Sequence, residues 1–118
     1  CVPISNITEC VNFAEEQAEK FGLRAPMVGH LGDGNFHVIL PYDPAKKEMY
    51  ERIREFNDLL IKKGLELNGT ITGEHGVGLH KKKYLLEQHA DNMPVMKSIK
   101  RTLDSNNIMN PGKIFDLN

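Results

Sequence analysis

Two histidines flank a glycine-rich turn in residues 29–37, whose sequence is GHLGDGNFH. Asp33 and Gly34 favour a two-residue type I′ turn between antiparallel strands, and that turn would pair His30 directly with His37. Directly opposed side chains share one face and have Cβ atoms about 4.5–5.5 Å apart, so both imidazoles could bind one divalent metal ion. The alternative is a pair of polar residues on a solvated face, because a slip of one residue would turn the rings to opposite faces.

A second group follows at residues 73–78, with the sequence GEHGVG. Glu74 would complete a set of two histidines and one carboxylate, which leaves coordination positions open for a substrate. The neighbouring His75 would point away from Glu74 on a straight strand, but the surrounding glycines permit a bend that brings both side chains into one pocket. A neutral imidazole can accept a hydroxyl proton near physiological pH, so His75 is predicted to be a base rather than a ligand. A surface glutamate and a structural histidine are the alternatives.

The hydrophobic pattern predicts strands and helices that would position these residues. Short strands are predicted at residues 2–5, 26–30, 35–40 and 70–72. One helix should separate the first two strands and another the last two, and two shorter helices should follow at 81–89 and 94–103. This order predicts an α+β fold: a ferredoxin-like antiparallel sheet with helices on one face, plus a helical C-terminal tail.

Both long helices carry end signals in the sequence. Asn6 is the expected N-cap of the first helix, and Gly22 is its expected end. Asp43 and Pro44 should begin the second helix, and Gly64 should stop it. Apolar residues recur at helical spacing in both helices, which predicts that each buries one face.

Composition and charge restrict the classes of function. The chain has 118 residues, enough for one domain, and a formal net charge of −1, which offers no electrostatic argument for binding nucleic acid or a membrane surface. No apolar stretch could span a bilayer, and no signal peptide is visible. Two cysteines, Cys1 and Cys10, are too few for a disulfide framework and predict reduced thiols. The chain opens without an initiator methionine, so we expect a piece of a longer protein.

Three motifs together resemble a known family. They are residues 30–37, residues 73–78 and a tail at 110–115 with the sequence NPGKIF. In this order and spacing they are similar to the C-terminal end of FAD-linked oxidases of the vanillyl-alcohol-oxidase superfamily. Within it they most resemble the cytochrome-type D-lactate dehydrogenases and the glycolate oxidase FAD subunit, with D-2-hydroxyglutarate dehydrogenase as a further cousin. The resemblance covers essentially the whole chain, which would be the C-terminal part of the substrate or cap domain, with the FAD-binding domain absent.

This resemblance implies a role for each candidate residue. In the family, two hairpin histidines and a glutamate hold a divalent metal, often zinc or manganese, and here these ligands would be His30, His37 and Glu74. His75 would accept the proton, and Asn110 would lie near the flavin of FAD. The implied reaction is oxidation of a D-2-hydroxy acid such as D-lactate, or of glycolate. Hydride would pass to the flavin, and electrons would then reach an acceptor that the sequence does not identify.

The resemblance also bears on substrate and partners. Ile39, two residues past His37, should share the histidines' face, where an apolar side chain favours a small monocarboxylate over a dicarboxylate. The implied partners are a small 2-hydroxy acid and the electron acceptor, with no nucleic acid. The isolated chain is expected to be inactive and to self-associate through surface that the FAD-binding domain would cover. The whole protein is expected to be cytoplasmic, or peripheral to the inner membrane.

Two other functions stay open on the residues alone. A metal-dependent hydrolase would use the same three ligands, with metal-bound water as the nucleophile. A non-catalytic ferredoxin-like binding module would keep the histidines as ordinary polar side chains.

Overall fold

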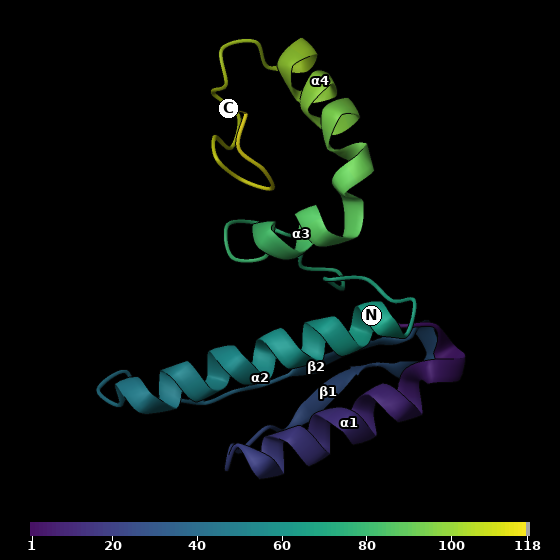
Figure 1. Cartoon of the computed structure of the whole chain (residues 1–118), viewed down its shortest axis with the longest axis vertical. Helices are drawn as coiled ribbons and strands as arrows, with labels where there is room; N and C mark the ends of the chain where they lie inside the picture. Colours follow the sequence, from purple (N-terminus) through teal and green to yellow (C-terminus); the bar gives the residue numbers. More distant parts are fainter. Residues whose placement is uncertain (118) are drawn as a thin grey trace. The chain divides into compact units, whose positions relative to one another are not determined.

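The computed structural model describes residues 1–117, and the chain divides into two compact units that meet at the bond between Gly73 and Glu74 (Figure 1). The first unit contains the two long helices and a two-stranded antiparallel sheet: α1 (Ile7–Lys20), β1 (Met27–His30), β2 (Asn35–Val38) and α2 (Lys47–Glu66). The second unit contains α3 (Lys82–His89) and α4 (Met93–Leu103).

Helices α1 and α2 cover one face of the β1–β2 hairpin, as Figure 1 shows. Alternate strand residues Met27, Phe36 and Val38 pack against the buried side chains of the helices, which include Ala18 and Phe56. Because neighbouring strand residues point to opposite faces, the residues between them lie on the uncovered face. The α+β class with helices on one face of an antiparallel sheet is therefore confirmed.

Helix α1 ends where the sequence predicts, but its first turn is stabilised differently. Gly22 takes a left-handed φ of +62°, and the N–H of Leu23 donates to the carbonyl of Ala18 at 2.8 Å, which is the hydrogen bond of a Schellman motif. The Asn6 side chain makes no capping bond to the helix. Its Nδ2 donates instead to the carbonyl of Leu67 at 2.9 Å, and its Oδ1, the atom that would cap the helix, accepts from the Ser5 hydroxyl, so its expected capping role is wrong.

Both predicted ends of α2 are wrong by a few residues. The Asp43 carboxylate accepts a hydrogen bond from the N–H of Ala45 at 3.0 Å and so forms a separate turn before the helix begins at Lys47. At the other end the helix passes through Gly64. It stops at Asn68, which has a left-handed φ of +59°, a conformation that asparagine tolerates better than most residues.

The first and last strands of the predicted sheet, residues 2–5 and 70–72, are not strands in the structure, but backbone hydrogen bonds are present at their positions. The N–H of Val2 donates to Gly34 at 2.9 Å, and the N–H of Thr70 donates to Cys1 at 2.8 Å. These bonds set residues 70, 1–2 and 34 side by side next to the hairpin, in the arrangement that a ferredoxin-like sheet requires. A full first strand does not form because Pro3 has no N–H for a ladder and a 3-10 helix, Ile4–Asn6, starts directly after it.

The second unit is the helical tail that the sequence predicts. Tyr84, Leu85 and Met93 are its buried apolar side chains, and a 3-10 turn, Ala90–Asn92, joins α3 to α4. After Leu103 the described residues form no helix or strand, as Pro111 and Gly112 of the tail predict. Within residues 1–117, no helix has both the length and the apolar character needed to cross a bilayer.

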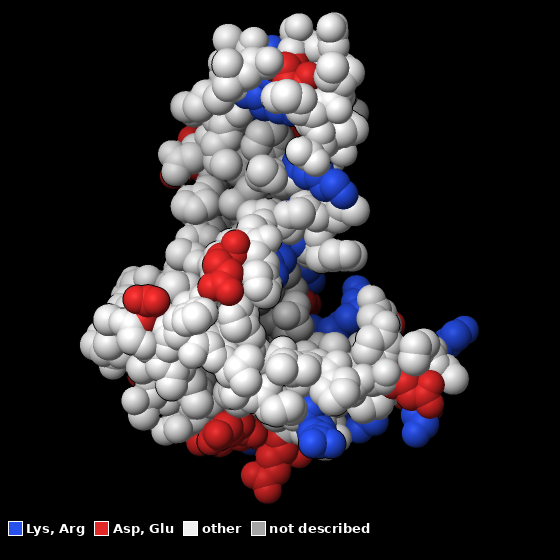
Figure 2. Space-filling view, turned by 180° about the vertical axis from the view of Figure 1, so that it is seen from behind, with Lys and Arg blue, Asp and Glu red and all other residues white. Residues whose placement is uncertain are grey.

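Charged side chains of both signs are scattered over the face of the chain seen in Figure 2, with uncharged surface between them. This mixture agrees with the formal net charge of −1.

Candidate functional site

The hairpin turn is longer than the predicted type I′ turn. Residues Leu31–Asp33 form a 3-10 turn, and Gly34 alone takes a left-handed φ, of +72°. A type I′ turn would need positive φ at both Asp33 and Gly34. The N-terminal segment packs on this turn, because a Cβ added to Gly34 would lie 2.0 Å from the carbonyl oxygen of Val2.

The register of the strands corrects the predicted pairing of the histidines. His30 lies opposite Asn35, and His37 lies opposite Val28, so the direct opposition of His30 and His37 is wrong. The register differs from the predicted one by two residues, which is an even number. Both histidines therefore stay on one face as diagonal neighbours, a relation that puts Cβ atoms roughly 7–8 Å apart or somewhat less. We call this the histidine face: it bears Val28, His30, Asn35 and His37.

The histidine face is the side of the hairpin that α1 and α2 do not cover. His30 is exposed and His37 is half-buried. Val28 is 55% exposed and Ile39 is 49% exposed, and the bond from the N–H of Ile39 to Pro26 at 2.9 Å continues the ladder. Ile39 thus shares the face of the histidines, as the strand alternation predicts.

Gly73, the last residue of the first unit, lies against the histidine face. A Cβ on Gly73 would lie 2.3 Å from Oδ1 of Asn35, so only glycine lets the backbone come this close. The Asn35 side chain itself is buried and sits between the positions of the two histidines in the ladder. Glu74 is the next residue along the chain, so its Cα lies about 3.8 Å from that of Gly73.

Glu74 and His75 open the second unit in a turn. Their side chains approach each other, with Oε1 of Glu74 3.6 Å from Nε2 of His75. Gly76, with φ of +75°, supplies the bend that the glycine spacing predicts. A carboxylate beside an imidazole can orient the ring.

Asn110 lies on the irregular tail of the second unit. It has a left-handed φ of +48° and lines a cavity of about 360 Å³ together with Lys100, Lys113 and Phe115. The tail is attached to the helices: Nζ of Lys82 donates to the carbonyl of Gly112 at 3.1 Å. A cavity with amide, amine and aromatic groups suits a partly polar organic ligand.

Asp104 and Lys100, which no sequence motif singles out, lie next to this tail. Lys100 forms an ion pair with the buried carboxylate of Asp104. Their spacing of four residues is a signal for a helix-surface pair, but it does not reveal the backbone groups of the tail that both side chains also bind.

Comparison with known proteins places this arrangement in a family. The model of the family "FAD linked oxidases, C-terminal domain" matches residues 1–114. The chain belongs to this family. The resemblance of the three motifs is thereby confirmed, and the histidine face, the Glu74–His75 turn and most of the tail lie within the matched residues of this FAD-linked oxidase domain.

Relatives of this FAD-linked oxidase domain have related names. The chain is 40% identical over 116 residues, 98% of its length, to the mitochondrial D-lactate dehydrogenase [cytochrome] of Arabidopsis thaliana. It is 39% identical over 115 residues, 97% of its length, to the glycolate oxidase subunit GlcD of Bacillus subtilis. It is also 39% identical over 90 residues, 74% of its length, to a D-2-hydroxyglutarate dehydrogenase of Stutzerimonas stutzeri. The chain spans 20%, 24% and 19% of these relatives.

Proposed function

We propose that this FAD-linked oxidase domain works in an enzyme that oxidises a small D-2-hydroxy acid, or glycolate, to the 2-oxo acid. The observation that carries the proposal is the shared chemistry of the relatives' names, since lactate, glycolate and 2-hydroxyglutarate are all 2-hydroxy acids. The domain is the C-terminal part of the substrate or cap domain in this proposal, and FAD is held mainly by a separate domain.

The donor set supports a divalent metal. His30 and His37 share one face, and Gly73 brings the backbone that leads to Glu74 against Asn35 on that same face. Two imidazoles and one carboxylate suit zinc or manganese and leave positions for other ligands. His30, His37 and Glu74 would hold the ion, which when bound would supply Lewis-acid polarisation of the substrate hydroxyl and a charge for its carboxylate.

The proposed chemistry needs two separate acceptors. His75 takes the hydroxyl proton on its neutral imidazole while the C2–H bond breaks, and the pair of electrons of the O–H bond forms the new C=O bond. The nearby Glu74 carboxylate stabilises the imidazolium that results. Bound flavin would supply the redox chemistry by accepting the hydride from C2. Asn110 is the residue of this chain proposed to face the flavin.

Ile39 supports a small substrate. It lies on the histidine side of the hairpin and is half exposed. An apolar side chain there offers no partner for a second carboxylate, whose burial without one would be unfavourable. We therefore infer that lactate or glycolate is preferred over 2-hydroxyglutarate.

Anaerobic flavin reduction tests the reaction. The chain, joined to its FAD-binding domain, is mixed with D-lactate, glycolate or D-2-hydroxyglutarate, and flavin bleaching is followed by absorbance. We expect the first two acids to bleach the flavin faster than the third. A hydrolase would leave the flavin oxidised with every acid, and that result would overturn the proposal.

Metal content and rate separate the proposed ligands from the proposed base. His37→Ala and Glu74→Ala should weaken zinc or manganese binding by more than the 10–100-fold or so that second-shell changes cost, as measured by elemental analysis after dialysis. His75→Ala should keep the metal and slow flavin reduction by about 10²–10⁴-fold. His80→Ala is the matched control, because His80 is an exposed histidine elsewhere in the second unit. Equal metal in all variants would refute the metal site.

A further inference from the structure

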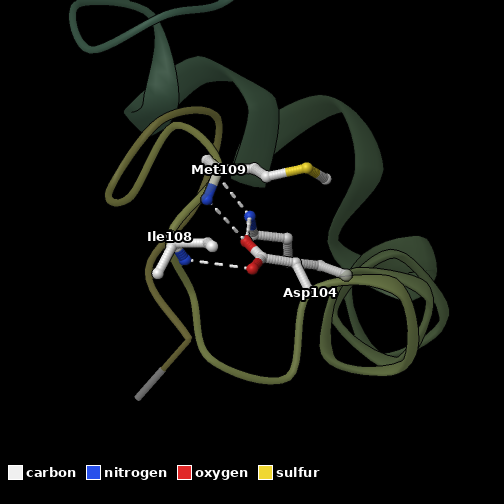
Figure 3. A network of polar contacts seen from close by, with 4 residues as sticks. Asp104, Ile108 and Met109 are labelled. Atoms are coloured by element: carbon white, nitrogen blue, oxygen red, sulfur yellow. Dashed lines mark hydrogen bonds and ion pairs between the residues drawn. The ribbon is translucent and has the colours of Figure 1, made fainter.

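The turn that follows α4 is built around one buried carboxylate. Asp104, only 6% exposed, accepts hydrogen bonds from the N–H groups of Ile108 and Met109, both at 3.0 Å (Figure 3). Lys100 forms an ion pair with the same carboxylate and also donates to the carbonyl of Met109. The N–H and the C=O of Met109 are therefore both held by this pair of side chains, directly before Asn110.

Asp104 occupies a position that α4 by itself disfavours. The C-terminal end of a helix carries partial negative charge, so a carboxylate there is destabilising unless other groups compensate it. Here Lys100 and two backbone N–H groups supply the compensation. Hydrogen bonding from Lys100 is also the main reason that the pKa of Asp104 lies below its ordinary value, against the opposing effect of burial. Asp104 and Lys100 therefore form an ion pair in which both side chains are charged.

The tail that this ion pair binds has unfavourable backbone φ values. Asn107, Asn110 and Ile114 all have left-handed φ values, of +50°, +48° and +70°. Left-handed φ is a marked outlier for a β-branched residue such as Ile114, and such conformations persist only where surrounding contacts over-determine them. Further contacts are present, because the N–H of Ile114 donates to Gly78 at 2.8 Å and Arg101 donates to Leu117.

We propose that Asp104 and Lys100 are positioning residues that set the conformation of Asn110 at the cavity of the tail. They act through Met109, whose N–H donates to Asp104 and whose carbonyl accepts from Lys100, and Asn110 is the group that meets the ligand. The inference rests on the proposed function only in taking that ligand to be flavin.

The first test uses hydrogen exchange in the chain itself. Asp104→Asn keeps the shape of the side chain but removes its charge and one acceptor oxygen, and Lys100→Met removes the cation while keeping the stem. Both should speed exchange of the Ile108 and Met109 amides at least about tenfold, the scale of losing a hydrogen bond to a charged group, with α4 amides unchanged. Asp91→Asn, an exposed aspartate in the same unit, is the matched control. Unchanged exchange at Ile108 and Met109 would overturn the proposal.

The second test asks whether Asp104 acts through Asn110. In the protein with its FAD-binding domain, FAD affinity and the flavin absorption spectrum are measured for Asp104→Asn, for Asn110→Ala and for the double variant. We expect each single change to weaken FAD binding and the double change to add little, because coupled residues are not additive. Additive losses, or no effect of Asn110→Ala, would overturn the proposal. If no 2-hydroxy acid reduced the wild-type flavin, the proposed function would fail. The coupling between Asp104 and Asn110 could still be measured from FAD affinity.

Discussion

At the scale of single residues, burial separates the two cysteines. Cys10 is 2% exposed and packs with Val2 and Leu67, whereas Cys1 is partly accessible. Burial raises the pKa of the Cys10 thiol above its ordinary value, because a thiolate in apolar surroundings is poorly solvated. The reactive thiolate form of Cys10 is therefore scarce as well as covered.

We predict that a thiol reagent such as Ellman's reagent modifies the native chain in two phases. Cys1 should react quickly, and Cys10 only as fast as local opening exposes it. Cys10→Ala should abolish the slow phase and leave the fast phase intact, while denaturant should merge the two phases in the wild type. A single fast phase that accounts for both thiols in the native chain would contradict the buried position of Cys10.

At the scale of elements, the hairpin turn depends on the first residues of the chain. Gly34 combines a left-handed φ with a backbone contact to Val2, both of which exclude a side chain. Gly32, in the same turn, has no left-handed φ, and a Cβ added there would meet nothing within 4 Å. A side chain should therefore be tolerated at Gly32 but not at Gly34.

We predict that Gly34→Ala lowers the free energy of unfolding by more than about 2 kcal/mol, since the left-handed conformation alone costs roughly 1–2 kcal/mol in a residue with a Cβ. The clash with Val2 adds to that cost. Gly32→Ala should stay within about 0.5 kcal/mol of the wild type, as surface changes usually do. Urea unfolding followed by circular dichroism measures both; equal losses in the two variants would mean that the contact with Val2 does not restrain the turn.

At the scale of the whole molecule, the uncovered side of the hairpin is the feature with the widest consequence. Val28 and Ile39 are about half exposed on the histidine side, and the chain spans only 20% of the Arabidopsis relative. Exposed apolar groups next to one another often mark an interaction surface. In the isolated chain, the same side chains are available to a second copy.

We predict that the isolated chain self-associates with rising concentration, as seen by sedimentation velocity. Replacing both Val28 and Ile39 by threonine should reduce the association, because it removes apolar area without changing charge. A matched control replaces Leu79 and Leu86, which are similarly exposed in the second unit, by threonine. Association that is lost in the control and retained in the hairpin variant would place the contact elsewhere.

Local rules were enough for many features of this chain. The helices form because apolar residues recur at helical spacing, and Gly22 ends α1 because it can adopt a left-handed φ. The shared face of His30 and His37 follows from strand alternation alone, and it survives a register that differs by two residues. The family resemblance of the three motifs also needed no coordinates, because it rests on residue identity and order.

Only tertiary contacts decided the rest. His30 pairs with Asn35 in a hairpin whose turn also contacts Val2, a residue far away in the chain. The Asn6 amide likewise donates to the carbonyl of Leu67, which is far away in the sequence. Asp104 and Lys100 have their role because the tail folds back and offers its backbone groups to them. Sequence periodicity reports which face a residue occupies, but the partner of a polar group depends on where distant backbone comes to lie.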